Sequence, residues 1–253
     1  MAAITLGLGA APLAAETIKV GVTGGPHAQI MEKVAELAAK QDLTIKVVEF
    51  HDYQLPNTAL AQGDLDANSF QHRPFLDNQV KDRGFKLTAI GQTVVFPLGV
   101  YSRKAKSLDQ LKEGDKVGIP NDPTNGGRAL LLLQSKGLIK LRPEAGIKAT
   151  PLDVVDNPRK LKFVELDAAQ LPRSLDDTGA SVINSNYALE AGLLPHRDAL
   201  ALEDPNSPYA NIIVVRSEDK DKPAFAKLVA IYHSDEVRRF IVDKFGSSLV
   251  PAF

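Results

Sequence analysis

The strongest constraint on the fold is a strand–turn–helix–strand unit near the start of the chain. The segment TIKVGVT (residues 17–23) alternates β-branched and other residues, which predicts a strand, and it ends at a Gly-Gly-Pro turn where a helix can begin. Apolar residues at helical spacing then predict a helix over residues 26–41, and a second strand, TIKVVEF, follows directly. This βαβ unit implies a parallel sheet.

The alternation of helix and strand continues through the first half of the chain. Residues 56–62 and 74–83 are predicted to form short helices closed by Gly63 and Gly84, and each is followed by an apolar segment that favours a strand. The long segment LTAIGQTVVFPLGVYS is interrupted by glycine and proline, which is typical of a strand pair that passes from one lobe into another. We place this first crossover near residues 96–101.

The second half repeats the pattern. Ser107 and Gln110 have the spacing of a capping box, which predicts a short helix, and a longer helix is predicted from about Asn125 to Lys136. Further strands are predicted in KVGIP, LKFVEL, ASVIN and NIIVVR, and the last two helices over residues 223–233 and 235–245.

Length and crossovers together predict two α/β lobes. A chain of 253 residues can hold two lobes, because single cores rarely grow beyond roughly 250 residues. The strand NIIVVR is predicted to return the chain to the first lobe. Lobe 1 then comprises residues 16–97 and 211–253, and lobe 2 comprises residues 98–210. Two crossover strands leave a cleft between the lobes, where ligands bind at the carboxyl ends of strands.

Charge, cysteine content and the first residues limit the partners and the compartment. The formal net charge is -1, with lysine and arginine scattered along the chain, which excludes a nucleic-acid partner. Residues 1–15 are apolar and uncharged, and we interpret them as the remnant of a signal peptide cleaved after Ala15; a buried N-terminal helix is the alternative. The signal peptide predicts a periplasmic protein. Since the sequence has no cysteine, we expect neither disulfides nor a lipid anchor.

The most informative local feature is the segment IPNDPTNGGRALLLL. It places Arg128 beside two glycines in what we predict to be the first turn of a helix. Free helix N–H groups, the helix dipole and the guanidinium fork would then form a receptor for a carboxylate. The segment lacks the lysine and spacing of a phosphate-binding loop. The alternative is a surface arginine on an ordinary helix start.

Aromatic and amide side chains gather near other predicted strand ends. Three aromatic or imidazole rings crowd the segment DANSFQHRPFL, with a tyrosine upstream, and a thioether gains favourable contacts at such rings. Asparagines follow one strand and begin another, where their carbonyl oxygens could accept from an ammonium group. Core rings and turn asparagines are the alternatives. The residues concerned are Tyr53, Phe70, His72, Phe75, Asn184, Asn186 and Asn211.

The sequence contains no recognisable catalytic or cofactor motif. Its five histidines lack the spacing of a zinc site, and a nucleophile elbow is missing as well. We therefore expect no catalytic residues, no bound metal and no cofactor.

Six segments in order resemble the NlpA family of methionine-binding proteins: HDYQLPNTALAQGDLDANSFQHRPFLD, VFPLGVYSRKAKSLDQL, VGIPNDPTNGGRALLLLQ, LPRSLDD, VINSNYA and SPYANIIVVR. The resemblance runs from about Ile18 to the C-terminus. It implies a periplasmic-binding-protein type II fold with a methionine site in the cleft, serving an ABC importer with a permease and an ATPase. The chain departs from the family by lacking the lipid-anchoring cysteine that many members carry.

The resemblance also implies roles for individual residues. Arg128 would hold the ligand carboxylate, and Asn184 and Asn211 would hold its polar main-chain end. The side chain would be enclosed by four residues, of which His72 or Tyr53 would be free to hydrogen-bond inside the pocket. The four are Tyr53, Phe70, His72 and Phe75.

Other functions stay open at this point. L-Methionine is the expected ligand, with D-methionine or a methionine-containing dipeptide as the near alternative. A periplasmic enzyme using His72 as acid or base, and a surface adhesion protein, are the remote ones. We expect a monomer in each case.

Overall fold

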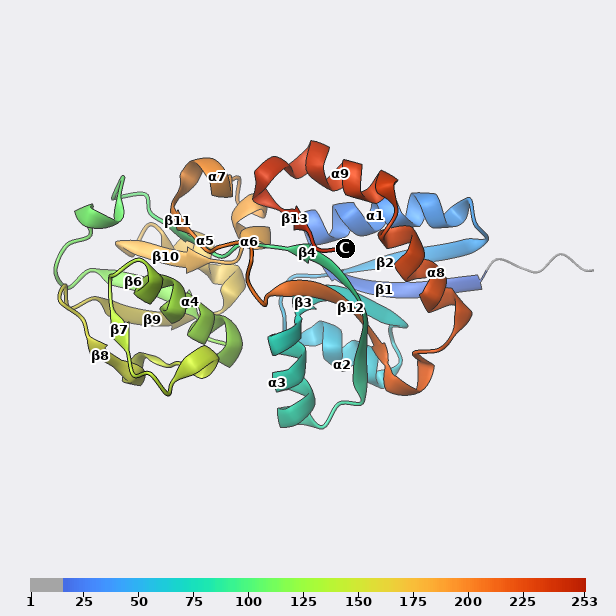
Figure 1. Cartoon of the computed structure of the whole chain (residues 1–253), viewed down its shortest axis with the longest axis horizontal. Helices are drawn as coiled ribbons and strands as arrows, with labels where there is room; N and C mark the ends of the chain where they lie inside the picture. The colour runs from blue at the N-terminus through green and yellow to red at the C-terminus, as the bar shows by residue number, and fades with distance from the viewer. Residues whose placement is uncertain (1–15) are drawn as a thin grey trace, which may run out of the picture.

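The structure is a computed structural model that describes residues 16–253, so the predicted signal-peptide remnant lies outside the described residues. Figure 1 shows two groups of strands side by side, each flanked by helices, with the chain passing between them near the middle of the molecule. The architecture is therefore α/β on both sides of the crossing, as the alternating sequence pattern predicts.

The first sheet has six strands and combines parallel and antiparallel pairs. β1 pairs in parallel with β2 along its whole length and with β3 on its other edge, and β12 is antiparallel to both of its neighbours. The predicted βαβ unit is thus confirmed. In spatial order the strands are β13 (Val250–Pro251), β4 (Leu87–Val95), β12 (Ala210–Arg216), β3 (Ala67–His72), β1 (Glu16–Thr23) and β2 (Leu43–Phe50).

The second sheet has five strands and repeats this plan. β6 lies in parallel between β10 and β9, whereas β5 is antiparallel to β10 and β11. In spatial order the strands are β11 (Ala199–Leu202), β5 (Gly99–Tyr101), β10 (Ala180–Ile183), β6 (Lys116–Pro120) and β9 (Lys162–Leu166). A separate two-stranded sheet pairs β7 (Lys140–Leu141) with β8 (Val154–Asp156).

Helices cover the faces of both sheets. Most begin with proline in the first turn, where its missing N–H leaves no hydrogen bond unmade. None of the helices within residues 16–253 combines the length and the apolar character required to cross a membrane. The α-helices are α1 (Pro26–Ala39), α2 (Leu55–Gln62), α3 (Arg73–Arg83), α4 (Pro123–Ser135), α5 (Leu171–Ser174), α6 (Ser185–Glu190), α7 (Pro195–Asp198), α8 (Pro223–Tyr232) and α9 (Asp235–Phe245).

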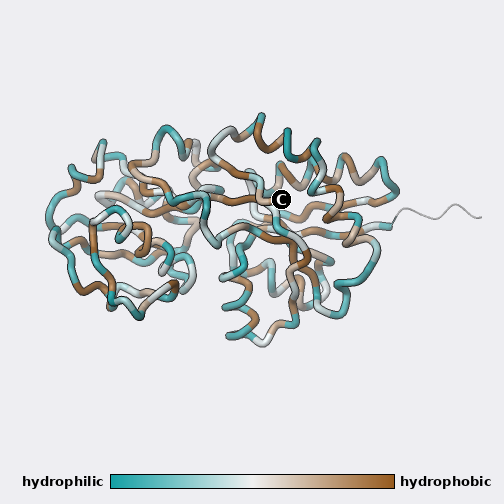
Figure 2. Tube along the Cα trace, in the orientation of Figure 1, coloured by the Kyte–Doolittle hydropathy of each residue, from teal (hydrophilic) through white to brown (hydrophobic). Residues whose placement is uncertain are grey.

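Each sheet has an apolar core of its own. Figure 2 shows hydrophobic segments running through the strands and hydrophilic ones along the outer helices and loops. In the first core, Val20 and Val22 of β1 are fully buried against α1 and the C-terminal helices. A further cluster contains residues from both sides, among them Tyr53 and Phe70 from the first and Leu171 and Tyr187 from the second. This shared cluster lies beside the site described below.

The chain crosses between the sheets twice. The first crossing joins β4 to β5, and the second joins β11 to β12, which begins one residue before the predicted boundary at residue 211. All strands of the first sheet fall within residues 16–95 and 210–251, and those of the second within residues 99–202. The division into lobes at these boundaries stays a prediction.

A short helix follows Ser107 as predicted, but the predicted capping box does not form. Residues Leu108–Gln110 form a single 3-10 turn, and the side chain of Ser107 does not cap it. The side-chain oxygen of Gln110 instead accepts a hydrogen bond from the backbone N–H of Lys106 at 2.7 Å. A capping box needs the Gln110 side chain to accept from the backbone N–H of Ser107, and it accepts one residue earlier instead.

Candidate functional site

A pocket at the crossing brings together all of the predicted ligand-binding residues. It encloses about 310 Å³ when its opening to solvent is included. The carboxyl ends of parallel strands from both sheets, β1, β3, β6 and β10, lead into it, as expected for open α/β sheets. Its lining residues are His27, Tyr53, Phe70, Gln71, His72, Phe75, Phe96, Asn125, Arg128, Asn184, Asn186 and Asn211.

Helix α4 begins earlier than predicted, which changes the surroundings of Arg128. Asp122 is the N-cap, and its carboxylate accepts from the backbone N–H of Asn125 at 2.9 Å. The predicted receptor of free helix N–H groups around Arg128 is therefore wrong, because Arg128 lies in the second turn and Asp122 caps the first. An aspartate followed by Pro123 is the local signal for this earlier start.

The two glycines before Arg128 serve close packing. A Cβ atom on Gly127 would lie 2.3 Å from the backbone oxygen of Ile147, and one on Gly126 would lie 2.9 Å from that of Pro120. Only glycine allows the helix to approach these two backbone segments so closely. The Gly-Gly pair thus allows α4 to pack closely against these segments, and Arg128, the next residue of the helix, lines the pocket.

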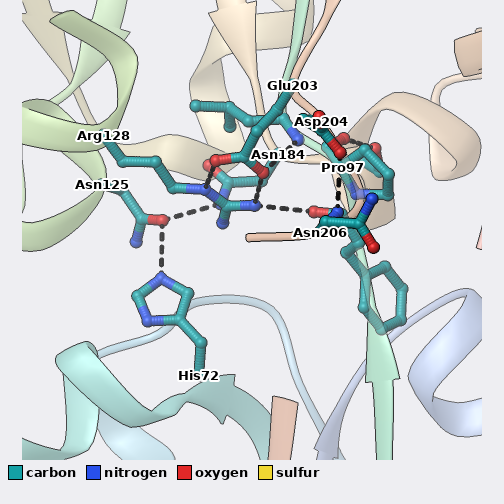
Figure 3. Close-up of polar contacts among 11 residues, drawn as sticks. His72, Pro97, Asn125, Arg128, Asn184, Glu203, Asp204 and Asn206 are labelled. Carbon is teal, nitrogen blue, oxygen red and sulfur yellow. Dashed lines mark hydrogen bonds and ion pairs between the residues drawn. The ribbon is translucent and has the colours of Figure 1, made fainter. Parts of the chain in front are cut away.

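Arg128 is held by a partner that sequence reasoning missed. Its Nε and Nη2 atoms donate to the two carboxylate oxygens of Glu203 at 2.8 and 2.5 Å, and Nη2 also donates to the backbone oxygen of Phe96 at 2.9 Å. The guanidinium stacks over the ring of Tyr209 at 4.2 Å. Figure 3 shows the two-pronged contact with Glu203.

This arrangement leaves one edge of the guanidinium for a ligand. Nη1 of Arg128 makes no hydrogen bond to any residue of the described chain, 16–253, whereas Nε and Nη2 are occupied. The Arg128 side chain is only 2% exposed and that of Glu203 is 12% exposed. Glu203 lies in a loop without periodic pattern, 75 residues from Arg128, so no local signal could have paired them.

An asparagine and a histidine connect the two sides of the pocket. His72, at the end of β3, accepts from the backbone N–H of Phe75 through Nδ1, so its proton lies on Nε2, which donates to Asn125 Oδ1 at 3.1 Å. Asn184 donates to the same oxygen at 3.0 Å (Figure 3). Burial, with the nearby Arg128 charge, lowers the pKa of His72 to about 3.

Aromatic rings form the opposite wall. Tyr53, Phe70 and Phe75 lie with their ring centroids 5.9–6.1 Å apart in tilted or edge-on contacts, the favoured geometries for aromatic pairs. The hydroxyl of Tyr53 donates to Asn186 Oδ1 at 2.6 Å, and burial raises the pKa of Tyr53 well above its ordinary value. Both ring nitrogens of His72 are engaged, so His72 is not free to hydrogen-bond to a ligand. The Tyr53 hydroxyl uses its proton on Asn186 and keeps an oxygen lone pair as an acceptor, so that part of the expectation stays a prediction.

A second histidine completes the pocket. His27 follows the Gly-Gly-Pro turn after β1, stacks on Phe96 at 4.3 Å, and lies 3.3 Å from Asn211 Oδ1 and 2.8 Å from the hydroxyl of Thr23. Burial lowers the pKa of His27 to about 4, which keeps it neutral. Its position after a strand and a glycine turn was a usable signal that our prediction did not use.

Two buried polar atoms of the pocket have no partner. Asn184 Oδ1 and Asn186 Nδ2 are inaccessible to solvent and make no hydrogen bond among the described residues. Leaving such atoms unpaired costs about 1–3 kcal/mol each, so native structures rarely keep them without a reason. In the pocket that Arg128 also lines, they offer an acceptor and a donor to a bound polar group. Within residues 16–253, no group of three or more metal-ligating side chains is arranged to hold an ion.

Comparison with known proteins identifies the family. The family model described as NlpA lipoprotein matches residues 18–253. The D-methionine-binding lipoprotein MetQ of Salmonella typhimurium is 54% identical over 224 residues, covering 87% of this chain and 82% of the relative. Outer membrane lipoprotein 3 of Mannheimia haemolytica is 47% identical over 237 residues, covering 93% and 90%. The chain therefore belongs to the NlpA lipoprotein family.

Solved structures show the same fold. A nutrient binding protein from Burkholderia cenocepacia bound to methionine superposes with a TM-score of 0.92 at 55% identity, covering 93% of this chain and all of that one. A structure of the methionine binding protein MetQ also gives 0.92, at 51% identity over 94% of this chain. The predicted two-lobed periplasmic-binding-protein type II fold is confirmed.

The predicted absence of a lipid anchor is contradicted. The family description and the relatives' names both say lipoprotein. The prediction rested on the missing cysteine and on the first fifteen residues.

Proposed function

We propose that this chain is a periplasmic substrate-binding protein that captures methionine in the pocket and delivers it to an ABC importer. The observation that carries the proposal is the pair of unpaired polar atoms, Asn184 Oδ1 and Asn186 Nδ2, in the pocket that Arg128 also lines. The same pocket is lined by the rings of Tyr53, Phe70 and Phe75. A ligand with one zwitterionic end and one apolar end would bond to the polar atoms and pack against the rings.

The ligand's orientation follows from these groups. Its carboxylate accepts from Arg128 Nη1, and its ammonium donates to Asn184 Oδ1, with Asn211 completing the polar end. The side chain lies against Tyr53, Phe70 and Phe75, where a thioether sulfur gains ring-edge contacts. His72 packs beside the ligand and keeps Asn125 in place.

The histidine-based enzyme alternative is not supported. Both ring nitrogens of His72 are engaged, and its pKa lies at about 3, so the imidazole is a weak base at neutral pH. The chain is a binding protein and not an enzyme, in line with the family to which it belongs.

Delivery to an importer requires the two lobes to close on the ligand. Lobe 1, residues 16–97 and 211–253, and lobe 2, residues 98–210, close on the ligand as two bodies around the crossovers. The hydrogen bonds from Tyr53 to Asn186 and from His72 to Asn125 join the two lobes. The protein acts as a monomer, and the closed form is the one presented to the importer's permease and ATPase complex.

Native mass spectrometry tests the ligand directly, because a tightly held amino acid survives purification and its mass identifies it. Calorimetry with L-methionine, D-methionine and a methionine dipeptide then separates the candidates. The D-form is a serious alternative, since several relatives carry it in their names. Purified protein that binds none of the three would overturn the proposal.

A further inference from the structure

We propose that Glu203 sets the charge selectivity of this pocket, so that it accepts a zwitterionic amino acid and rejects an anionic acid with the same side chain. The inference rests on the proposed function and concerns a residue outside the pocket lining. It assigns to the buried Arg128–Glu203 pair a role in recognition in addition to its structural one.

The charges around the pocket support this role. Among the lining residues of the described chain, Arg128 alone carries a formal charge, because both histidines are buried and neutral. Glu203 contacts Arg128 with both carboxylate oxygens and cancels that charge. Asp122 does not line the pocket, and its carboxylate is held by groups at the start of α4, namely the N–H and side-chain amide of Asn125 and the hydroxyl of Thr124.

Electroneutrality decides which ligand fits. An isolated carboxylate brought into a buried site beside an existing ion pair adds an uncompensated negative charge, which is strongly unfavourable away from water. A zwitterion adds no net charge, and its ammonium is attracted to the same Glu203 that repels the carboxylate. Without Glu203, the open guanidinium would favour an anion.

Glu203 is also held in place by hydrogen bonds to Leu98, which keep its charge beside Arg128. Its own N–H donates to the backbone oxygen of Leu98 at 2.8 Å, and its Oε2 accepts from the N–H of Leu98 at 3.3 Å. The carboxylate is therefore tied to the first crossover as well as to Arg128. A test must separate the charge of Glu203 from this positioning of Arg128.

The experiment compares two ligands by calorimetry: methionine, and the same acid without its α-amino group. Glu203→Gln keeps the shape and an acceptor for Arg128 but removes the charge, whereas Glu203→Asp keeps the charge and shifts the contact. Glu236→Gln, on the exposed face of α9, is the matched control. We expect Glu203→Gln to lower the preference for methionine over the desamino acid by roughly tenfold or more.

Glu203→Asp should weaken the binding of both ligands while keeping the preference within about threefold of the wild type. The control Glu236→Gln should leave both affinities and the preference unchanged. A purely structural role predicts that Glu203→Gln also keeps the preference, and that result overturns the inference. If Glu203→Gln does not fold, the wild type alone decides: binding of the desamino acid within about threefold of methionine overturns it, and a preference of about a hundredfold or more supports it. Failure of the wild type to bind methionine would instead overturn the proposed function.

Discussion

The two walls of the pocket are built by opposite means. The side of the first sheet contributes three rings, Tyr53, Phe70 and Phe75, which meet at tilted and edge-on angles. The polar residues on this side are His27, Gln71, His72 and Asn211. The wall from the second sheet consists of amides and one guanidinium, whose atoms are held by a buried hydrogen-bond network running from Asp122 to Asn125 and from Glu203 to Arg128. The rings provide apolar contacts for the ligand's side chain, and the amides and guanidinium provide hydrogen bonds for its charged end.

This difference predicts which residues of the site tolerate substitution. Ring packing is non-directional, so a ring can be replaced by another apolar group with a modest loss. A buried polar network loses much more when one member is removed, because the remaining members stay desolvated and unpaired. Substitutions in the polar wall should therefore have the larger effects.

Removal of Arg128 should have the largest effect. Arg128→Ala should weaken methionine binding by about 2–5 kcal/mol, since the ligand carboxylate would be buried without its partner. Arg128→Lys should bind poorly as well, because a point charge cannot both hold Glu203 and donate from Nη1. Calorimetry measures both.

The matched control for this change is Arg216→Ala. Arg216 also forms a partly buried ion pair, with Asp219 at 2.7 Å, but does not line the pocket. Both alanine variants should lower the melting temperature, and only Arg128→Ala should reduce affinity. Equal affinity loss in the two variants would mean that the polar wall has been misplaced.

Acidification should unfold the protein partly through its neutral histidines. The pKa values of His72 and His27 are lowered by burial to about 3 and about 4, below the ordinary value of 6.5. Below pH 6.5 the unfolded chain therefore binds protons that the folded chain excludes. Each histidine's contribution is complete above that pH and is lost on acidification at a rate approaching about 1.4 kcal/mol per pH unit.

Denaturant unfolding at several pH values measures this loss. His72→Gln keeps a donor for Asn125 and cannot titrate, so its stability should fall less steeply between pH 6 and 4 than that of the wild type. Parallel stability curves for the two proteins would show that the folded state accommodates a charged His72.

Removal of the Tyr53 hydroxyl should have a smaller effect and should act on closure. Tyr53→Phe deletes one hydrogen bond across the cleft and leaves Asn186 Oδ1 unpaired, which should weaken methionine binding by about 1 kcal/mol. Small-angle scattering should show methionine compacting the wild type more completely than the variant.

Tyr232→Phe removes a hydroxyl from the first core, away from the cleft, and should leave affinity and compaction unchanged. Identical scattering of empty and methionine-loaded wild type would contradict closure altogether.

The smallest effect should come from the aromatic wall. Phe70→Leu should reduce the preference for methionine over norleucine by about 0.5 kcal/mol, since one ring that contacts the sulfur is lost while apolar area is largely kept. Phe240→Leu, on α9, is the control. A loss of methionine affinity in Phe70→Leu equal to that in Arg128→Ala would contradict the contrast between the two walls. Melting temperatures in the presence of each ligand provide the comparison.

The local pattern of the sequence predicted most of the fold. Glycines at 63 and 84 end α2 and α3 in the left-handed conformation, and the periodicity of residues 26–41 gave α1 to within two residues at its end. Family resemblance placed seven residues that the structure gathers in one pocket. The capping box at Ser107 failed because the spacing of the two residues does not decide which backbone N–H the Gln110 side chain reaches, and it bonds that of Lys106.

The sequence by itself determined the strands, the helices and the kinds of side chain that stand at the strand ends, because these depend on residues close together in the chain. Only the tertiary structure decided that Glu203 occupies the fork of Arg128, that Tyr53 bonds to Asn186 across the cleft, and which polar atoms remain open for a ligand. Such pairings join segments separated by 75 and 133 residues. They are set by how the two sheets pack at the crossovers, and no periodicity within one segment encodes that geometry.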